Sequence, residues 1–258
     1  MITSTANAKV KQLVQLQKKS KSRREQGVFI VEGSRLLEET PHERITEVYL
    51  AESYHREHPA TMFPGVSPEI LADHVFTHVS DTKKPQGILG VVKMAEHAPE
   101  TMLSVTHPYL LILDNLQDPG NMGTLFRTAE AAGVTGIIMS RECVDIYNPK
   151  VIRATMGSIY RMPFMYTDDL KAIIHQIKDS GIRIYAAHLD GRQIYDQENY
   201  QKKTAFMLGN EGNGLRKEIA DLADIRIKIP MQGEVESLNA AIAGAVLMFE
   251  AARQRRRK

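Results

Sequence analysis

Three polar segments rich in glycine and asparagine are the candidates for chemistry in this chain. They are residues 113–129, 206–215 and 229–239. Each begins where a short apolar or β-branched run ends, and such runs halted by turn-forming residues predict strands. Ligands bind at the carboxyl ends of strands in open α/β sheets, so three polar loops in these positions predict one shared active site.

The usual cofactor fingerprints are absent from these segments. The glycines of the second segment have the wrong order of spacings for Gly-x-Gly-x-x-Gly, and no Gly-Lys-Ser or Gly-Lys-Thr occurs, which disfavours ordinary NAD and ATP sites. Two histidine pairs have helical ligand spacing, His55 with His58 and His74 with His78. Neither pair has a cluster of acids or cysteines beside it, so we expect structural or surface roles and no metal site.

The elements that must position the segments alternate regularly from residue 109 onward. The expected strands are 110–113, 136–140, 164–166, 183–188, 204–208 and 225–229. The expected helices are 122–132, 149–159, 170–180, 215–222 and a terminal helix from Ser237. Strands alternating with helices of this length predict an α/β fold with a parallel sheet covered by helices on both faces.

A second, smaller domain is expected before this sheet. Residues 1–95 open with a basic amphipathic helix and continue with strands at 28–31, 48–51 and 88–94 and a helix at 34–39, which predicts a small α/β/α module. Residues 96–108 have weak periodicity and two prolines, so we interpret them as a linker. The catalytic domain is then expected to span 109–258.

Composition limits the class of protein. The chain has 258 residues, 43% of them hydrophobic and 25% charged, which suits a globular protein of one large or two modest domains. Cys143 is the single cysteine, which excludes an internal disulfide and a cysteine-based zinc site. The amino terminus lacks a signal-peptide pattern, and no apolar stretch is long enough for a membrane span. We therefore expect a cytoplasmic protein without membrane contact.

Positive charge collects at both ends of the chain. Residues 1–26 hold seven basic residues against one acid, and residues 253–258 hold five more basic residues. A solvated helix face and a frayed tail would explain either cluster alone. Together they favour a polyanionic partner, above all nucleic acid, bound through its phosphates.

The three segments, taken together, resemble the SpoU/TrmH family of RNA 2'-O-ribose methyltransferases in the SPOUT superfamily. The family's first motif, an asparagine, five residues and then Arg-Thr-Ala, is matched by Asn121 and by Arg127, Thr128 and Ala129. The second, Gly-Asn-Glu-Gly-x-Gly-Leu, is matched by residues 209–215. The third, Ile-Pro-Met and then Ser-Leu-Asn, is matched by residues 229–231 and 237–239. The resemblance covers essentially the whole chain.

This resemblance implies a fold, a cofactor and partners. It implies a deep carboxyl-terminal trefoil knot that holds S-adenosylmethionine, and an amino-terminal RNA-binding domain similar to ribosomal protein L30e, with residues 29–33 as its most typical piece. It also implies a homodimer with the terminal helix in the interface, which agrees with the apolar character of that helix on nearly every side. RNA is the expected substrate. A guanosine of 23S ribosomal RNA is the first choice, and transfer RNA is the alternative.

The resemblance also assigns roles to residues. It places the catalytic arginine at Arg127, which would act on the ribose 2'-hydroxyl either as a base or, more comfortably for a guanidinium, as a stabiliser of the alkoxide. The other residues expected at the catalytic centre are Asn121, Glu211, Ser237 and Asn239. The expected cofactor contacts are Leu208, Gly209, Ile229, Met231, Ser237 and Leu238.

Several of these residues have a second, structural interpretation. Asn121 is expected to cap its helix or to orient Arg127 and the target ribose. Glu211 is expected to pair with Arg127, to fix a loop amide or to be a plain turn residue. Ser237 is a good helix N-cap by position, and Asn239 is expected to face the ribose. The apolar members of the cofactor set are equally compatible with core packing, and Gly209 with close backbone approach.

Two other functions remain open at this stage. One is a non-catalytic RNA-binding protein on the same fold, which the presence of all five catalytic candidates disfavours. The other is a small-molecule nucleotide enzyme, which the missing phosphate loop and the basic chain ends disfavour.

Overall fold

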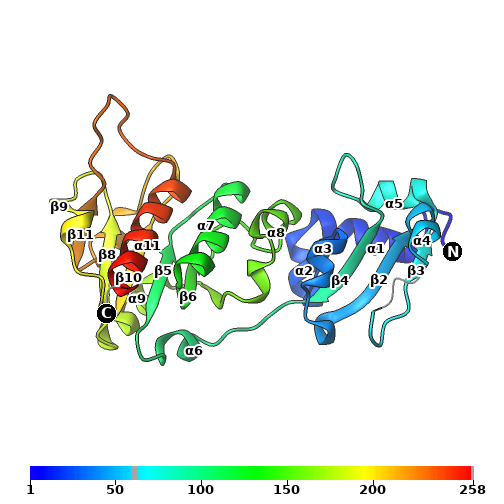
Figure 1. Ribbon diagram of the computed structural model, residues 1–258, viewed down its shortest axis with the longest axis horizontal. Coiled ribbons are helices and arrows are strands. Elements are labelled where there is room, and N and C mark those ends of the chain that lie inside the picture. The colour runs from blue at the N-terminus through cyan, green and yellow to red at the C-terminus, as the bar shows by residue number, and fades with distance from the viewer. Residues whose placement is uncertain (60–62, 257–258) are drawn as a thin grey trace. The chain divides into compact units, whose positions relative to one another are not determined.

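The computed structural model describes residues 1–59 and 63–256, which form two compact units (Figure 1). The amino-terminal unit holds residues 1–95 and 145–160, and the carboxy-terminal unit holds residues 96–144 and the chain from Arg161 onward. This grouping differs from the continuous domain 109–258 expected from the sequence. The ring of Tyr147 lies 4.6 Å from that of Phe29, and Asp145 pairs with the buried guanidinium of Arg23. No local pattern in the sequence reveals such contacts.

The amino-terminal unit is built on a four-stranded sheet with the order β1-β4-β2-β3. Its strands are β1 (Val28–Glu32), β2 (Ile45–Ala51), β3 (Glu69–Leu71) and β4 (Ile88–Lys93). β4 is antiparallel to both neighbours, and β2 is parallel to β3. The structure confirms the three strands that the sequence predicts here. The fourth strand, β3, is too short to leave a period-two pattern in the sequence.

Helices surround this sheet. They are α1 (Ala8–Lys18), α2 (Ser20–Gln26), α3 (Ser34–Glu38), α4 (Glu52–Glu57), α5 (Asp73–Val79) and α8 (Pro149–Thr155). α1 and α5 bury Val10, Leu13 and Phe76 against strand residues of β2 and β4. Asn7 begins α1 by accepting a hydrogen bond from Lys9 N, as a helix N-cap does.

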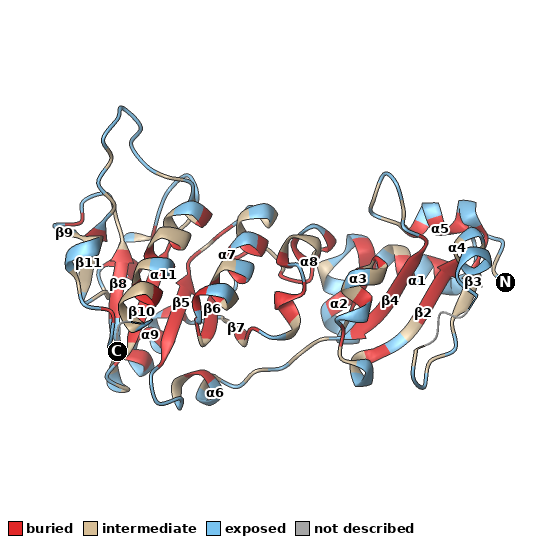
Figure 2. Ribbon diagram, in the orientation of Figure 1, coloured by how far each residue is buried: buried red, intermediate tan, exposed pale blue. Residues whose placement is uncertain are grey.

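The carboxy-terminal unit is built on a seven-stranded parallel sheet with the order β7-β6-β5-β10-β8-β11-β9. Its strands are β5 (Tyr109–Leu113), β6 (Gly136–Ser140), β7 (Phe164–Thr167), β8 (Arg183–Ala187), β9 (Gln193–Ile194), β10 (Thr204–Leu208) and β11 (Ile225–Lys228). The central strands are buried along their full length (Figure 2). This is typical of a parallel sheet that is covered on both faces.

Both faces of this sheet carry helices. α6 (Pro99–Leu103), α9 (Leu170–Asp179) and α10 (Lys217–Ala220) share one apolar core. α7 (Pro119–Ala132) and α11 (Ala240–Arg256) lie side by side elsewhere on the sheet (Figure 1). Gly244 permits the close approach of α11, because a Cβ there would lie 2.5 Å from the Leu125 side chain and 2.8 Å from that of Leu208.

The predicted fold class is therefore confirmed, with a parallel sheet between helices and a separate, smaller α/β unit. The helix bounds differ at two functional places. α7 begins three residues before the expected Met122, since Asp118 caps it and Pro119 fits its first turn. The terminal helix begins at Ala240 and not at Ser237. No helix in the described part of the chain is long and apolar enough to cross a bilayer.

Candidate active site

The first two polar segments start side by side. β5 and β10 are paired in register, so that Leu113 lies opposite Leu208 at their carboxyl ends. The pairing continues one step further, because Asp114 N donates to Leu208 O at 2.9 Å. The loops that follow these strands therefore leave the sheet together, as the sequence analysis predicts for a shared site.

Glu211 fastens the second segment to the first. Its carboxylate accepts hydrogen bonds from Asp118 N at 2.9 Å, Gln117 N at 3.2 Å and Asn121 Nδ2 at 3.1 Å. Burial raises the pKa of Glu211, but these hydrogen bonds outweigh it and hold the pKa below its ordinary value. Of the roles considered for Glu211, the structure supports the fixing of loop amides. No ion pair with Arg127 is present among the described residues.

Asn239 fastens the third segment to the first. Its Nδ2 donates to Asn121 Oδ1 at 3.0 Å, while its Oδ1 accepts from Ala241 N at 2.9 Å and Ile242 N at 3.3 Å. The second set of bonds is an N-cap of α11. A continuous chain of hydrogen bonds thus runs from Asn239 through Asn121 to Glu211, with one member from each segment.

The capping roles expected for two residues are wrong. Asn121 does not cap α7, because Asp118 Oδ1 accepts the hydrogen bond from Asn121 N at 2.7 Å. Ser237 does not cap α11, because the helix begins at Ala240 and Asn239 caps it. Ser237 is exposed in the loop before the helix. The side chain of Asn121 is consequently available to link Glu211 and Asn239.

Arg127 lies on α7, six residues or somewhat less than two turns after the hydrogen-bonded Asn121. Its side chain is exposed and forms no hydrogen bond or ion pair with any residue that the structure describes. Six residues along an α-helix correspond to about 9 Å. The first segment thus combines a fixed polar network at the start of α7 with a guanidinium further along the helix whose donors are all available.

Gly209 lies too close to the backbone of its own loop to carry a side chain. A Cβ at this position would lie 2.1 Å from both Gly214 C and Leu215 N, which no side chain tolerates. The second segment turns back on itself here, since Asn210 and Gly214 exchange two backbone hydrogen bonds of 2.9 Å. Close approach of the chain's own backbone therefore explains this glycine.

The other residues expected at the cofactor lie around these loops. Leu208 is buried, while Ile229, Met231 and Leu238 are partly buried. From residue 230 to residue 238, no backbone amide or carbonyl forms a hydrogen bond with another described residue. This loop therefore presents backbone donors and acceptors beside apolar side chains.

The sequence analysis missed one pair of residues that holds the second segment. Asp114 is fully buried, and its carboxylate accepts from Arg216 N at 3.0 Å and from Arg216 Nε at 2.9 Å. Hydrogen bonding to Asp114 raises the pKa of Arg216. The signal in the sequence is an aspartate directly after a buried strand and an arginine directly after the glycine-rich motif.

One histidine of each pair has a structural contact, and all four histidines are exposed. His58 stacks on Tyr54, with ring centroids 4.3 Å apart, and the ring of His74 is hydrogen-bonded to Thr3 O at 3.1 Å. Among residues 1–59 and 63–256, no group of three or more metal-binding side chains gathers in one place.

Comparison with known proteins identifies the family of this chain. The SpoU rRNA Methylase family matches residues 108–249, and the MRM3-like substrate binding domain matches residues 7–90. The chain is 32% identical to the 23S rRNA (guanosine(2553)-2'-O)-methyltransferase RlmP of Bacillus subtilis, over 96% of this chain and 97% of that relative. It is 31% identical to the 23S rRNA (guanosine-2'-O-)-methyltransferase RlmB of Shewanella oneidensis, over 89% of this chain and 96% of that relative.

A solved structure gives the same result. The AdoMet-bound rRNA methyltransferase from Sinorhizobium meliloti superposes with a TM-score of 0.84 at 30% identity, over 98% of this chain and 97% of that one. The family match covers more than half of the chain and includes all three polar segments. The chain therefore belongs to the SpoU rRNA Methylase family and is an RNA methyltransferase.

Proposed function

We propose that this protein transfers a methyl group from S-adenosylmethionine to the ribose 2'-hydroxyl of a guanosine in 23S ribosomal RNA. The hydrogen-bond chain from Asn239 through Asn121 to Glu211 carries the proposal, because it assembles three distant segments into one site. The choice of substrate is supported by relatives that are named for this activity and match nearly the whole chain.

The loops of this chain fit S-adenosylmethionine. Its adenine is neutral and its methionine end is zwitterionic, so backbone amides and carbonyls beside apolar side chains suit it better than a cluster of charges. The unpaired backbone of residues 230–238, with Leu208, Met231 and Leu238 nearby, is such an environment. We assign these residues, together with Ile229, to the cofactor. When bound, the cofactor supplies a methyl group on a positively charged sulfur.

Arg127 is the residue that we assign to the chemical step. The ribose oxygen forms a bond to the methyl carbon as the bond from that carbon to sulfur breaks, and the hydroxyl proton passes to water. A guanidinium has five N–H donors and no acceptor, so it cannot take this proton in its charged form. Its donors instead stabilise the negative charge that develops on the ribose oxygen. The absence of an ion-pair partner for Arg127 among the described residues leaves these donors available.

We further propose a homodimer that uses α11. Ile242 is 51% exposed and Phe249 is 45% exposed, and they are seven residues apart on one face of this helix. Two large apolar side chains so close together on a surface are typical of a protein interface. The trefoil knot stays a prediction that the family resemblance implies, and a cytoplasmic location stays a prediction from the sequence.

Methyl transfer to defined RNA tests the function. Purified protein is incubated with methyl-tritiated S-adenosylmethionine and with ribosomal or transfer RNA from cells that lack it, and nuclease digests are analysed by mass spectrometry. We expect label as 2'-O-methylguanosine in 23S RNA. Label confined to transfer RNA would overturn the proposal that ribosomal RNA is the substrate. RNA binding without any transfer would indicate a non-catalytic protein, and methylation of mononucleotides alone a small-molecule enzyme.

A further inference from the structure

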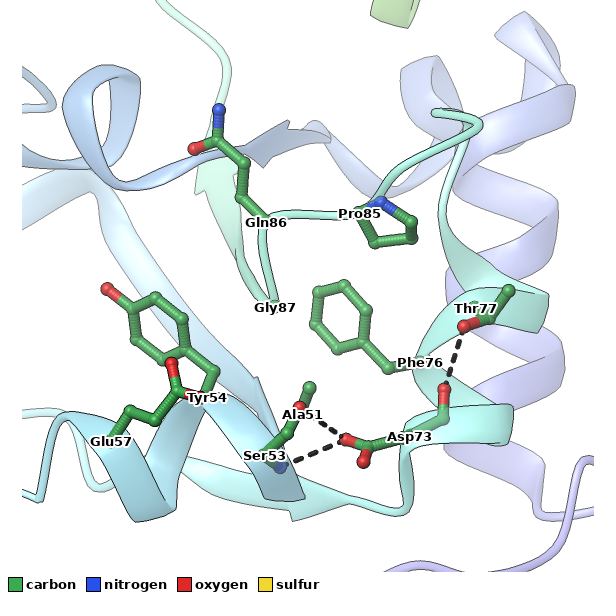
Figure 3. Close-up of a pocket in the computed structure, with 10 residues that line it drawn as sticks. All are labelled: Ala51, Ser53, Tyr54, Glu57, Asp73, Phe76, Thr77, Pro85, Gln86 and Gly87. Carbon is green, nitrogen blue, oxygen red and sulfur yellow. Dashed lines mark hydrogen bonds between the residues drawn. The ribbon is translucent and has the colours of Figure 1, made fainter.

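A hollow of about 250 Å³ lies in the amino-terminal unit and takes no part in the methyl transfer described above. It opens where β2 ends and where α4 and α5 begin, and residues 85–87 close another side (Figure 3). Its lining residues are Ala51, Ser53, Tyr54, Glu57, Asp73, Phe76, Thr77, Pro85, Gln86 and Gly87.

Tyr54 gives this hollow a fixed aromatic wall. Its ring is partly exposed and is held from one side by His58, with the two ring planes 19° apart. Gly87, at φ +83°, lets Tyr54 pack directly on the backbone, because a Cβ at Gly87 would lie 2.6 Å from Tyr54 Cβ. Phe76 is buried and forms part of the inner surface (Figure 3). A flat ring that enters the hollow can therefore stack on a tyrosine that is already in place.

The polar edge of the hollow includes two carboxylates beside the hydroxyls of Ser53 and Thr77 and the side-chain amide of Gln86. Asp73 Oδ1 accepts from Ser53 N at 3.0 Å and from Ser53 Oγ at 2.8 Å, which leaves its Oδ2 without a partner among the described residues. These two hydrogen bonds hold the pKa of Asp73 below its ordinary value, so the carboxylate is ionised at neutral pH. Glu57 adds a second carboxylate. Both groups can only accept hydrogen bonds.

Positive charge lies in the loop that leads into the hollow. Lys83 and Lys84 directly precede Pro85, and both are exposed. Glu32 anchors the start of this loop by accepting from Ser80 Oγ at 2.6 Å and from Thr82 Oγ1 at 2.8 Å. Two lysines on an anchored loop beside an aromatic hollow are suited to the phosphates of a nucleotide whose base is inserted.

We propose that this hollow holds one unstacked guanine of the substrate RNA. The ring stacks on Tyr54, its N1–H and N2 amino groups donate to the carboxylates of Asp73 and Glu57, and the adjoining phosphates lie at Lys83 and Lys84. Guanine alone among the four bases carries two adjacent donors on its Watson–Crick edge. Adenine and cytosine place an acceptor nitrogen beside their amino group, and uracil has a single donor between two carbonyls. The inference rests on the proposed function only in taking RNA as the substrate.

The absence of tryptophan from the chain allows a direct test. Tyr54→Trp in the full-length protein supplies a single fluorophore at the aromatic wall. Guanosine, adenosine, cytidine and uridine 5'-monophosphates are titrated against it, with tryptophan emission as the readout. We expect quenching by the guanosine nucleotide at a concentration at least about tenfold lower than by the others, the scale of one good bidentate contact.

Two further variants in the Tyr54→Trp background locate the contact. Asp73→Asn keeps an oxygen for Ser53 but loses the negative charge, and we expect it to abolish the guanine preference. Glu52→Gln makes the same change of charge on α4 outside the hollow, where Glu52 pairs with Arg56, and should keep the preference. Circular dichroism verifies that each variant is folded.

The outcomes that overturn the inference are distinct from those that overturn the proposed function. No quenching by any of the four nucleotides, equal quenching by all four, or a preference that survives Asp73→Asn would each show that the hollow is not a guanine site. The titration requires neither cofactor nor methyl transfer. Guanine binding without methylation would therefore count against the proposed function alone. Methylation without guanine binding would count only against the inference that the hollow is a guanine site.

Discussion

The side-chain amide of Asn239 donates to the side-chain oxygen of Asn121 at 3.0 Å, across 118 positions of sequence. The same Asn239 caps α11 through its own oxygen. One asparagine therefore sets both the start of the last helix and the position of the first motif. The amide is needed for this double role, because it offers a donor and an acceptor on one planar group.

Asn239→Asp separates the two roles. Aspartate is as good an N-cap as asparagine, so we expect the free energy of unfolding to change by less than about 1 kcal/mol. The lost donor leaves a carboxylate facing the oxygen of Asn121, and methyl transfer should fall at least about tenfold, the effect of roughly one hydrogen bond. Urea unfolding and tritium transfer measure the two quantities. An unchanged rate would contradict the role of the network.

Arg127→Ala should remove the chemical step and little else. We expect methyl transfer to fall by at least about a hundredfold, the usual scale for one charge-stabilising group, while cofactor affinity stays within a few fold. Stability should not change, because the side chain is exposed and has no partner among the described residues. Arg192→Ala is the matched control, as Arg192 is also exposed. Equal loss of cofactor binding and transfer would refute the assignment.

Glu211 should make the site sensitive to acid. The pKa of Glu211 in the folded protein lies below the ordinary value of 4.5. Its contribution to stability is therefore complete above that value and is lost as the pH falls through the lowered pKa. We expect the free energy of unfolding of Glu211→Gln to decrease less than that of the original chain as the pH falls below 4.5. Glu218→Gln, a control at an exposed position, should show the same decrease as the original chain. Unfolding at a series of pH values is the measurement, and identical acid profiles for all three proteins would exclude the effect.

Phe249→Glu tests the proposed subunit interface. A charge in the middle of an apolar contact is costly to desolvate, so the variant should sediment as a monomer. Leu189→Glu places the same change on a residue that is 65% exposed and distant in sequence, and it should leave the assembly intact. Analytical ultracentrifugation distinguishes the two. A wild-type protein that is monomeric at micromolar concentration would disprove the homodimer.

Local sequence was sufficient for the elements but not for the choice between neighbouring polar residues. Ser237 and Asn239 are both good N-caps, and the contact that selects Asn239 comes from α7, which is remote in sequence. In the same way, Asp118 and Pro119 start α7 by rules that are readable in the sequence, although the apolar pattern alone favours a start at Met122. Strands of two or three residues, such as β9, carry no usable period.

Contacts that form only when the chain folds explain the other differences. Gly209 is required by the backbone at Gly214 and Leu215, a return of the chain that no spacing rule encodes. The pair between Asp114 and Arg216 joins residues 102 positions apart. Asp114 and Arg216 each had a visible signal in the sequence, because each is a charged residue directly after a strand or a motif. That the two residues pair is known only once β5 and β10 are placed side by side.

The place of β10 has a consequence for biosynthesis. This strand lies between β5 and β8, yet its residues follow both of them in the chain. While the ribosome is still translating, β5 and β8 each have an unpaired edge, which is a template for aggregation. A polypeptide released before residue 204 should consequently require chaperones and bind no methyl donor, and soluble, cofactor-competent truncations ending there would argue against this order of assembly.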